Sequence, residues 1–299
     1  MLFAFLTTAL FAIGAVSARL LVTRLGSMLA NFLRLAVATV FLAVWAFAWG
    51  RGIEGPGFVW FVLSGIVGFG FGDIALYFAL PRIGARLTML LTQCLAAPFA
   101  ALMEWLWLGT TLTPLELLLG AIVLGGIALA LVPKDNLHIE PGKLVPGVIF
   151  GIIAGAGQGG GAVISRKAFD VSLAAGIEID GGTAAFQRVI GGVVIGWIAW
   201  MLLRKRADEK RSAAILPVFR EARPAMLLAT TALFGPVLGV AAFQWALSTA
   251  PSGIVLPIVG LTPIVIIPIS YWLEGDRPKP RSILGGVIAV AAAIALAAQ

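Results

Sequence analysis

Apolar residues fill ten long stretches of this chain, separated by connectors that are mostly short and polar. A helix needs about 20 mainly apolar residues to cross a bilayer, and fewer when charged residues bound it. Because lipid offers no partners for backbone groups, such stretches are expected to form helices. The pattern predicts ten transmembrane spans, near residues 2–18, 29–49, 58–80, 84–108, 114–132, 144–165, 183–203, 225–248, 252–273 and 281–298.

Short motifs of the first half of the chain recur in the second half in the same order. The offset between matching residues changes only between spans. The recurring pieces are Gly109, Pro114 and Gly120 as Gly275, Pro280 and Gly286; Phe32-x-Arg34 as Phe186-x-Arg188; Ala79-Leu80 as Ala246-Leu247; and Ser17 as Ser165. An odd number of spans per repeat places the two halves antiparallel in the membrane. The pattern predicts an all-α integral membrane protein of two inverted five-helix repeats around a central cavity. The first repeat is 1–132, the polar connector 133–143 and the second repeat 144–299, in one structural domain.

Composition excludes a soluble globular protein. Of the 299 residues, 60% are hydrophobic and 12% charged, and the mean hydropathy is +1.03. The net charge of +7 comes from basic residues in the gaps between apolar runs, which favours the membrane surface over nucleic acid as their partner. Cys94 is a lone cysteine in an apolar run and His138 a lone histidine in a polar connector, so neither a metal site nor a cofactor is expected.

Basic residues also indicate orientation, because cytoplasmic connectors carry an excess of lysine and arginine. All 21 of them lie in or beside the odd-numbered connectors except Arg51, Arg166, Lys167 and Arg188. The charges therefore place both termini outside the cell. The longest connector, 204–224, is strongly basic and is interpreted as a surface loop or an interfacial helix.

Asp73 is the sharpest candidate for function, since a carboxylate deep in a span is costly and stands alone in this sequence. It is interpreted either as a substrate-amine partner or proton-coupling site, or as a structural group bonded to a neighbouring helix. Tyr77 lies one turn further on and shares its face. Gln93, Gln158 and Gln244 in spans four, six and eight could bind a polar or zwitterionic substrate, or simply join helices.

Flexible and polar positions supply further candidates. Pro98 and Pro263 inside spans four and nine favour kinks, as hinges or as fixed bends; Thr262 would satisfy a freed carbonyl. Gly157 and Gly159 belong to a glycine-rich run that is interpreted as close helix packing or as a softened helix, two compatible roles. Arg34 and Arg188 are interpreted either as partners of lipid headgroups or of other helices, or as anion binders. Glu104 is interpreted as an interfacial residue or as part of a gate. Trp245 and Trp272 are interpreted as cavity aromatics or as membrane-belt anchors.

The motifs resemble those of the drug/metabolite transporter superfamily, in its ten-span EamA-type branch. The resemblance covers nearly the whole chain and rests on Phe32-Leu33-Arg34 and Phe186-Gln187-Arg188, on Tyr77-Phe78-Ala79-Leu80 and Gln244-Trp245-Ala246-Leu247, on Pro98 and Pro263, and on the turns at Leu108-Gly109 and Glu274-Gly275-Asp276-Arg277. It implies a helical basket that moves small metabolites, often outward, with cytoplasmic termini. The turns depart from the family's usual Gly-Glu, with Thr110 and Asp276 at that place.

We therefore predict a secondary transporter in the cell (inner) membrane that exports a small polar metabolite, such as an amino acid, by alternating access. The alternative is a lipid-linked sugar or lipid flippase of the same fold. An intramembrane enzyme is disfavoured, because the catalytic serine, histidine or paired-carboxylate patterns it needs are missing. One chain with both repeats needs no partner to close its cavity, so a monomer suffices and a dimer stays open.

Overall fold

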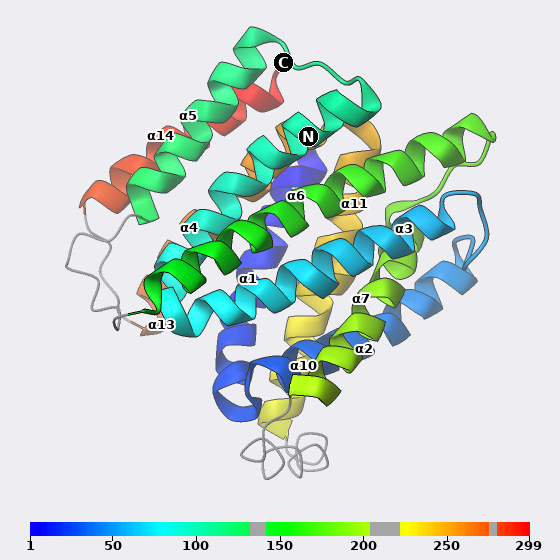
Figure 1. The fold of residues 1–299 in the computed structure, drawn as a ribbon, viewed down its shortest axis with the longest axis horizontal. Helices are drawn as coiled ribbons and strands as arrows, with labels where there is room; N and C mark the ends of the chain where they lie inside the picture. Colours follow the sequence, from blue (N-terminus) through cyan, green and yellow to red (C-terminus); the bar gives the residue numbers. More distant parts are fainter. Residues whose placement is uncertain (132–141, 204–221, 275–279) are drawn as a thin grey trace.

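The computed structural model describes residues 1–131, 142–203, 222–274 and 280–299, and within them the chain is almost entirely helical (Figure 1). Ten helical stretches in these ranges are long and apolar enough to cross a membrane, which confirms the predicted count. His138 and most of the basic connector 204–224 lie outside the described residues. The division into 1–132, 133–143 and 144–299 stays a prediction.

Helical elements follow one another with few residues between them. The first half contains α1 (Leu2–Leu25), α2 (Ser27–Ala48), α3 (Phe58–Gly65), η1 (Ile66–Gly72), α4 (Asp73–Leu108) and α5 (Pro114–Leu131). The second half contains α6 (Leu144–Ala174), α7 (Gly181–Leu203), α10 (Ala222–Ala232), η2 (Leu233–Val237), α11 (Leu238–Thr249), α12 (Ser252–Val259), α13 (Thr262–Glu274) and α14 (Pro280–Ala297).

The third and fourth spans meet at Gly84. This residue has φ 73° inside α4, a left-handed backbone value that glycine adopts without the penalty of a Cβ atom. It is the non-helical residue within α4, so the chain reverses there. Pro98, the expected kink, lies in the following regular part of the helix.

The third and eighth spans are each interrupted by a π-helical segment. η1 begins at Ile66 and η2 at Leu233, which is the same 167-residue offset that relates Ala79 to Ala246. Such segments disturb the regular hydrogen-bond ladder and are frequent at functional sites. In η2 the disturbance has a local cause, because Pro236 lacks the amide hydrogen that a regular helix would use.

The ninth span is broken into two helices. α12 ends at Val259 and α13 begins at Thr262, so Pro263 is the second residue of a new helix rather than a kink within one. The Thr262 hydroxyl donates to the carbonyl oxygen of Val259 at 2.7 Å, as the sequence suggested. The proposed hinge roles of Pro98 and Pro263 stay predictions.

The first helix of each half packs into the other half. α6 lies against α3, η1 and α4, while α1 lies against α10, η2, α11, α12 and α13. Figure 1 shows α6 running beside α3. Neither set of five spans buries its own first helix, so the two halves form one interlocked bundle.

Glycines in α6 allow this close approach. A Cβ atom on Gly157 would lie 2.7 Å from the Cα atom of Gly72, and one on Gly159 would lie 2.4 Å from the carbonyl oxygen of Ala96. α6 continues unbroken from Leu144 to Ala174. The glycines therefore pack closely against the first half, as one interpretation expected, while a softened helix and a hinge role for Gly157 and Gly159 stay predictions.

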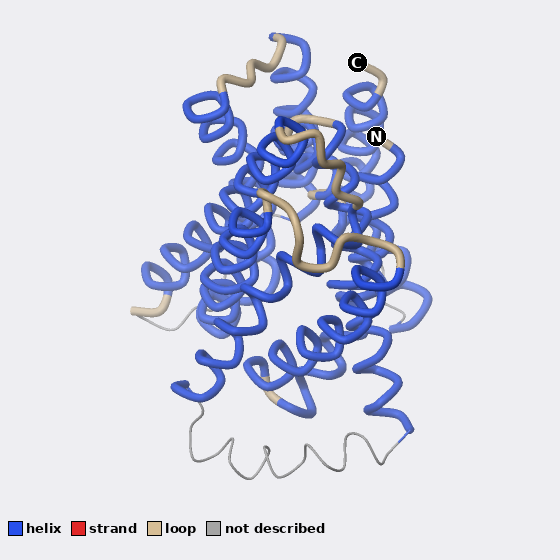
Figure 2. Tube along the Cα trace, turned by 90° about the vertical axis from the view of Figure 1, so that its right-hand side faces the viewer, coloured by secondary structure: helices blue, strands red, loops and turns tan. Residues whose placement is uncertain are grey.

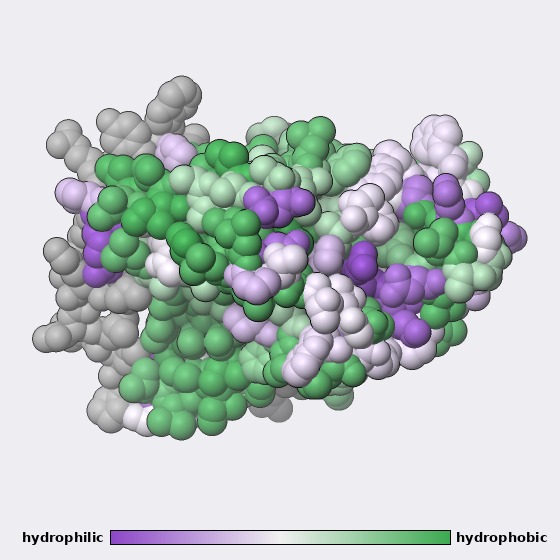
Figure 3. All heavy atoms as spheres, turned by 90° about the horizontal axis from the view of Figure 1, so that it is seen from above, coloured by the Kyte–Doolittle hydropathy of each residue, from purple (hydrophilic) through white to green (hydrophobic). Residues whose placement is uncertain are grey.

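The two chain termini lie at the same end of the bundle (Figure 2). Large apolar side chains such as Val40 and Val145 point outward and are exposed, as expected where helices face lipid. Figure 3 shows apolar residues over most of the face viewed, with hydrophilic residues gathered at the end where Figure 1 places the turns after α2 and α6.

Candidate functional site

Asp73 is ion-paired within the bundle. It is the first residue of α4, directly after η1, and its Oδ2 atom lies 2.7 Å from Nη2 of Arg34 on α2. The Nε–H of Arg34 donates to Oδ1 of Asn31 at 2.9 Å, which orients the guanidinium. This bond agrees with the interpretation of Asp73 as a group bonded to a neighbouring helix and of Arg34 as a bundle partner, while a role of Asp73 in substrate binding or proton coupling stays a prediction.

This pair is only partly covered by protein. The side chains of Arg34 and Asp73 keep 20% and 23% of their surface exposed, whereas Asn31 beside them is buried at 2%. Tyr77, one turn along α4, is also half-buried and lies within electrostatic range of both charges. The pair is thus a charged position in the bundle that a small molecule could contact.

Arg188 is the repeat counterpart of Arg34, but its surroundings differ. Its side chain is buried at 4% exposure, and in the described part of the chain no carboxylate lies within the 4.0 Å of an ion pair. The guanidinium carbon lies 5.0 Å from the ring centre of Phe69 and 5.6 Å from that of Phe243. These cation–π contacts offset part of the cost of burying the charge.

Small residues make room for this guanidinium. A Cβ atom on Gly68 of η1 would lie 2.6 Å from Nη2 of Arg188, and one on Gly161 of α6 would lie 3.2 Å from it. The matching residue of the other half, Gly235 in η2, faces Nη1 of Arg34 at 4.0 Å. Each repeated arginine therefore points at the π-helical segment of the opposite half.

Ser165 gathers polar groups beside Arg188. Its hydroxyl pairs with that of Ser64 at 2.7 Å, accepts from Nε2 of Gln244 at 3.2 Å, and lies 3.5 Å from Nη1 of Arg188. Ser64 also donates to the carbonyl oxygen of Gly161 at 2.6 Å. Ser64, Ser165 and Gln244 have no exposed surface, so this cluster lies fully inside the bundle.

The other two glutamines form a separate contact. The amide of Gln158 on α6 donates from Nε2 to Oε1 of Gln93 on α4 at 3.3 Å. Gln93 is buried, and the bond joins the two halves. The sequence treated Gln93, Gln158 and Gln244 as one set, but the structure places Gln244 in the Ser165 cluster instead.

Trp245 belongs to an aromatic group near the ends of the helices. Its ring stacks on Phe3 with centres 5.3 Å apart and meets Trp45 edge-on at 6.0 Å. Trp45 donates from Nε1 to Oδ1 of Asp180, which also accepts the backbone amides that open α7. Trp245 thus helps to join α1, α2 and α11, and the side chain of Trp272 lies outside the described residues.

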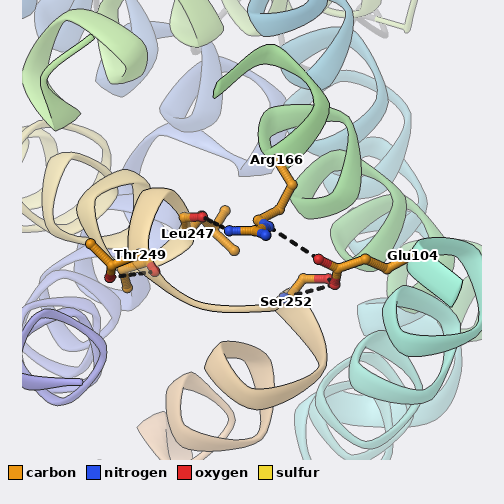
Figure 4. A network of polar contacts seen from close by, with 6 residues as sticks. Glu104, Arg166, Leu247, Thr249 and Ser252 are labelled. Atoms are coloured by element: carbon orange, nitrogen blue, oxygen red, sulfur yellow. Dashed lines mark hydrogen bonds and ion pairs between the residues drawn. The ribbon is translucent and has the colours of Figure 1, made fainter. Parts of the chain in front are cut away.

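Glu104 is buried and holds three segments together. Its exposed fraction is 2%, and its Oε1 atom accepts from Nε of Arg166 on α6 at 3.1 Å. Its Oε2 atom accepts from both the backbone amide and the hydroxyl of Ser252, the first residue of α12. Arg166 in turn donates to the carbonyl oxygen of Leu247 at 2.8 Å, so α4, α6 and the turn between α11 and α12 meet here (Figure 4). Glu104 is thus ion-paired inside the bundle, while its position near the membrane interface and its role in a gate stay predictions.

A second set of bonds joins the halves nearby. Gln187 on α7 donates to the carbonyl oxygens of Gly52 and Glu54 in the turn after α2. Arg51 in the same turn donates from Nε to the carbonyl oxygen of Glu178. Together with the Glu104 network, these contacts join the two halves at the end of the bundle that carries both termini.

Comparison with known proteins decides the class. The family model described as the EamA-like transporter family matches residues 1–132 and 145–298. The chain belongs to the EamA-like transporter family. This EamA-family protein is therefore a multi-pass membrane transporter of the drug/metabolite transporter type, which confirms the resemblance.

Two further comparisons bear on this EamA-family protein. No curated protein matches the chain. A solved structure titled "Crystal structure of protein" matches with a TM-score of 0.77 and 15% identity, covering 99% of this chain and 95% of its own. At that identity the likeness shows the shared fold alone. Within the described residues, no group of three or more His, Cys, Asp and Glu side chains could hold a metal ion.

Sequence reasoning missed several residues of these networks in the EamA-family protein. The sequence marks Ser165 only as a repeated position, and it does not indicate that Ser64, Arg166 and Ser252 are partners in these networks. The repeated Phe-x-Arg motif and the Ser17/Ser165 pair were the available signals. Both mark positions where a polar side chain recurs in an apolar span, which is costly unless it has a partner.

Proposed function

We propose that this EamA-family protein exports a small polar metabolite, such as an amino acid or related compound, across the cell membrane by alternating access. The observation that carries the proposal is the charged group formed by Arg34, Asp73 and Arg188 inside an apolar ten-span bundle. Ionisable residues at such depth are expensive and typically mark a substrate or ion pathway.

The two halves supply the moving parts in this proposal. Inverted repeats that rock against each other would expose the charged group to one side and then the other. Paired π-helical segments at equivalent positions, and the break between α12 and α13, are places where helices can adjust with little loss of regular hydrogen bonding.

In this proposal, the Glu104 network holds the two halves together at one end of the bundle. Its bonds join α4 of the first half to α6 and α12 of the second, so they have to separate when that end opens. Glu104→Gln would weaken this network and change the rate of transport more than the affinity for substrate. Asp170→Asn is the matched control, since Asp170 lies on the exposed surface of α6.

Counterflow in proteoliposomes tests the proposal. Vesicles containing the purified protein are loaded with pooled unlabelled amino acids and metabolites and challenged with labelled members of the pool. Specific accumulation that Asp73→Asn abolishes and Asp170→Asn preserves supports a carrier that uses Asp73. If folded protein accumulates no member of any pool, the proposed function is wrong.

A further inference from the structure

The charged group inside the bundle holds one positive charge in excess. Arg34 and Asp73 neutralise each other at 2.7 Å, and Arg188 has no carboxylate partner among the described residues. Its nearest opposing charge is Asp73, which is already engaged by Arg34. A buried, unpaired charge is strongly unfavourable, so a site that keeps one is expected to receive a counter-ion.

Two polar atoms in the Arg188 cluster lack partners. The Nε–H of Arg188 donates to nothing, and Oε1 of Gln244 accepts from nothing, although both atoms are buried. Arg188 reaches Ser165 only through a long 3.5 Å contact from Nη1. Since buried polar atoms are nearly always hydrogen-bonded, these two orphans on side chains that share the Ser165 hydroxyl indicate a missing ligand group.

The repeat identifies the position in the second half that corresponds to Asp73, the counter-ion of Arg34. The offset of 167 that pairs the two π-helical segments also pairs Asp73 with Val240, and Tyr77 with Gln244. The position that neutralises Arg34 in the first half is thus valine in the second. The second half therefore has the arginine of the motif but not the carboxylate, and its guanidinium lies over Phe69 and Phe243 instead.

We infer that Arg188 binds an oxyanion of the transported molecule, a carboxylate or a phosphate, with the Ser165–Gln244 pair contacting its neighbouring polar group. This inference rests on the proposed carrier function and names the substrate class. The guanidinium fork suits bidentate contact with an oxyanion, and its Nε–H is free to make one of the two bonds. In this arrangement Asp73 pairs with Arg34 and is not the group that binds a substrate amine.

Paired substrates test this inference. Counterflow is run with labelled carboxylic and amino acids against the corresponding amides, and with sugar phosphates against the free sugars. The variants are Arg188→Gln, Arg188→Lys and, as a matched control, Arg82→Gln, because Arg82 also lies over two phenylalanine rings, at 5.5 and 5.0 Å, but outside this cluster.

The wild-type protein is expected to prefer the anionic member of a pair by about tenfold or more, the preference that a charge-assisted hydrogen bond supports. Arg188→Gln should bring the two members of the pair close to equality, while Arg82→Gln keeps the wild-type ratio. Arg188→Lys, which keeps the charge without the fork, should keep the preference with a raised KM. The pair that shows the preference distinguishes a carboxylate from a phosphate. Thermal unfolding with and without the anion, which should stabilise the wild type but not Arg188→Gln, gives a readout that is independent of transport.

Three results would count against the inference in different ways. Transport restricted to cations or neutral compounds overturns the inference and leaves the carrier function standing. An anion preference that survives in folded Arg188→Gln also overturns it. Absence of any accumulation by folded protein contradicts the carrier function itself, and the inference falls with it.

Discussion

Arg34 and Arg188 come from the same repeated Phe-x-Arg motif but occupy different electrostatic environments. Arg34 is a fifth exposed, bonded to Asp73 at 2.7 Å and to Asn31 at 2.9 Å. Arg188 is almost fully buried, lies between two phenylalanine rings and has one long contact to a hydroxyl. Position 73 is aspartate and the equivalent position 240 is valine, and Arg188 has no carboxylate partner among the described residues.

This difference shows that two halves with matching helices can hold their equivalent arginines in unlike surroundings. Symmetry fixes where helices and π-helical segments lie, as the shared 167-residue offset indicates. Polar groups that break the symmetry decide where charge accumulates.

The largest effect is expected when each arginine is neutralised in turn. Arg34→Gln leaves Asp73 charged and unpaired, and should lower the free energy of unfolding by about 3 kcal/mol or more. Arg188→Gln removes an unpaired buried charge, and should leave stability unchanged or raise it. Thermal unfolding of both purified variants in the same detergent measures the contrast, and equal losses would contradict it.

Restoring the missing carboxylate should couple strongly to Arg188. Val240→Asp adds a buried charge at the repeat position equivalent to Asp73, and we expect that charge to pair with Arg188 as Asp73 pairs with Arg34. A double-mutant cycle with Arg188→Gln should give a coupling of about 1.5–3 kcal/mol, with the aspartate far less tolerated when the arginine is gone. Additive stability losses would show that position 240 does not face Arg188.

Matched glycine substitutions probe the space around each guanidinium. Gly68→Ala places a methyl group 2.6 Å from Nη2 of Arg188, which Phe69, Phe243 and Gly161 confine, and should cost about 1–2 kcal/mol. Gly235→Ala meets Arg34 only at 4.0 Å and should be close to neutral. Urea or thermal unfolding of the two variants checks this order, and equal, near-zero losses would show that Arg188 moves freely.

The smallest effect is expected at the neutral contact between α4 and α6. Gln158→Leu removes a single 3.3 Å bond to Gln93, and hydrogen bonds between membrane helices average about 0.6 kcal/mol. The loss in stability should be of that size, with anion preference retained. A loss of preference would move the substrate site from the Arg188 cluster towards this pair.

The helices could be predicted from sequence because hydrophobic length dominates their formation. All ten spans follow from the apolar runs, and the turn at Gly84 lies where one run yields to the next. The π-helical segments and the break after Val259 could not be predicted, since they depend on how glycines and prolines pack against another helix. The glycine run in α6 indicated close helix packing, and it packs against η1 and α4.

The candidate site could be predicted only in part. Asp73 could be predicted as a candidate because a carboxylate at membrane depth is costly unless it has a partner or a function. The same argument applies to Arg188. Position along a span did not tell which arginine reaches Asp73, because that depends on the crossing of α2 and α4. Ser165 and Gln244 come from distant segments, so their common contact appears only in three dimensions.

Transport by Val240→Asp tests the central claim most directly. The variant gives Arg188 the counter-ion that Arg34 already has, at the equivalent repeat position. If Arg188 receives the anionic group of the substrate, counterflow of the anion should be lost while thermal unfolding shows the protein folded. Wild-type anion counterflow in a folded, stabilised Val240→Asp protein would contradict the account, because Arg188 would then need only a structural partner.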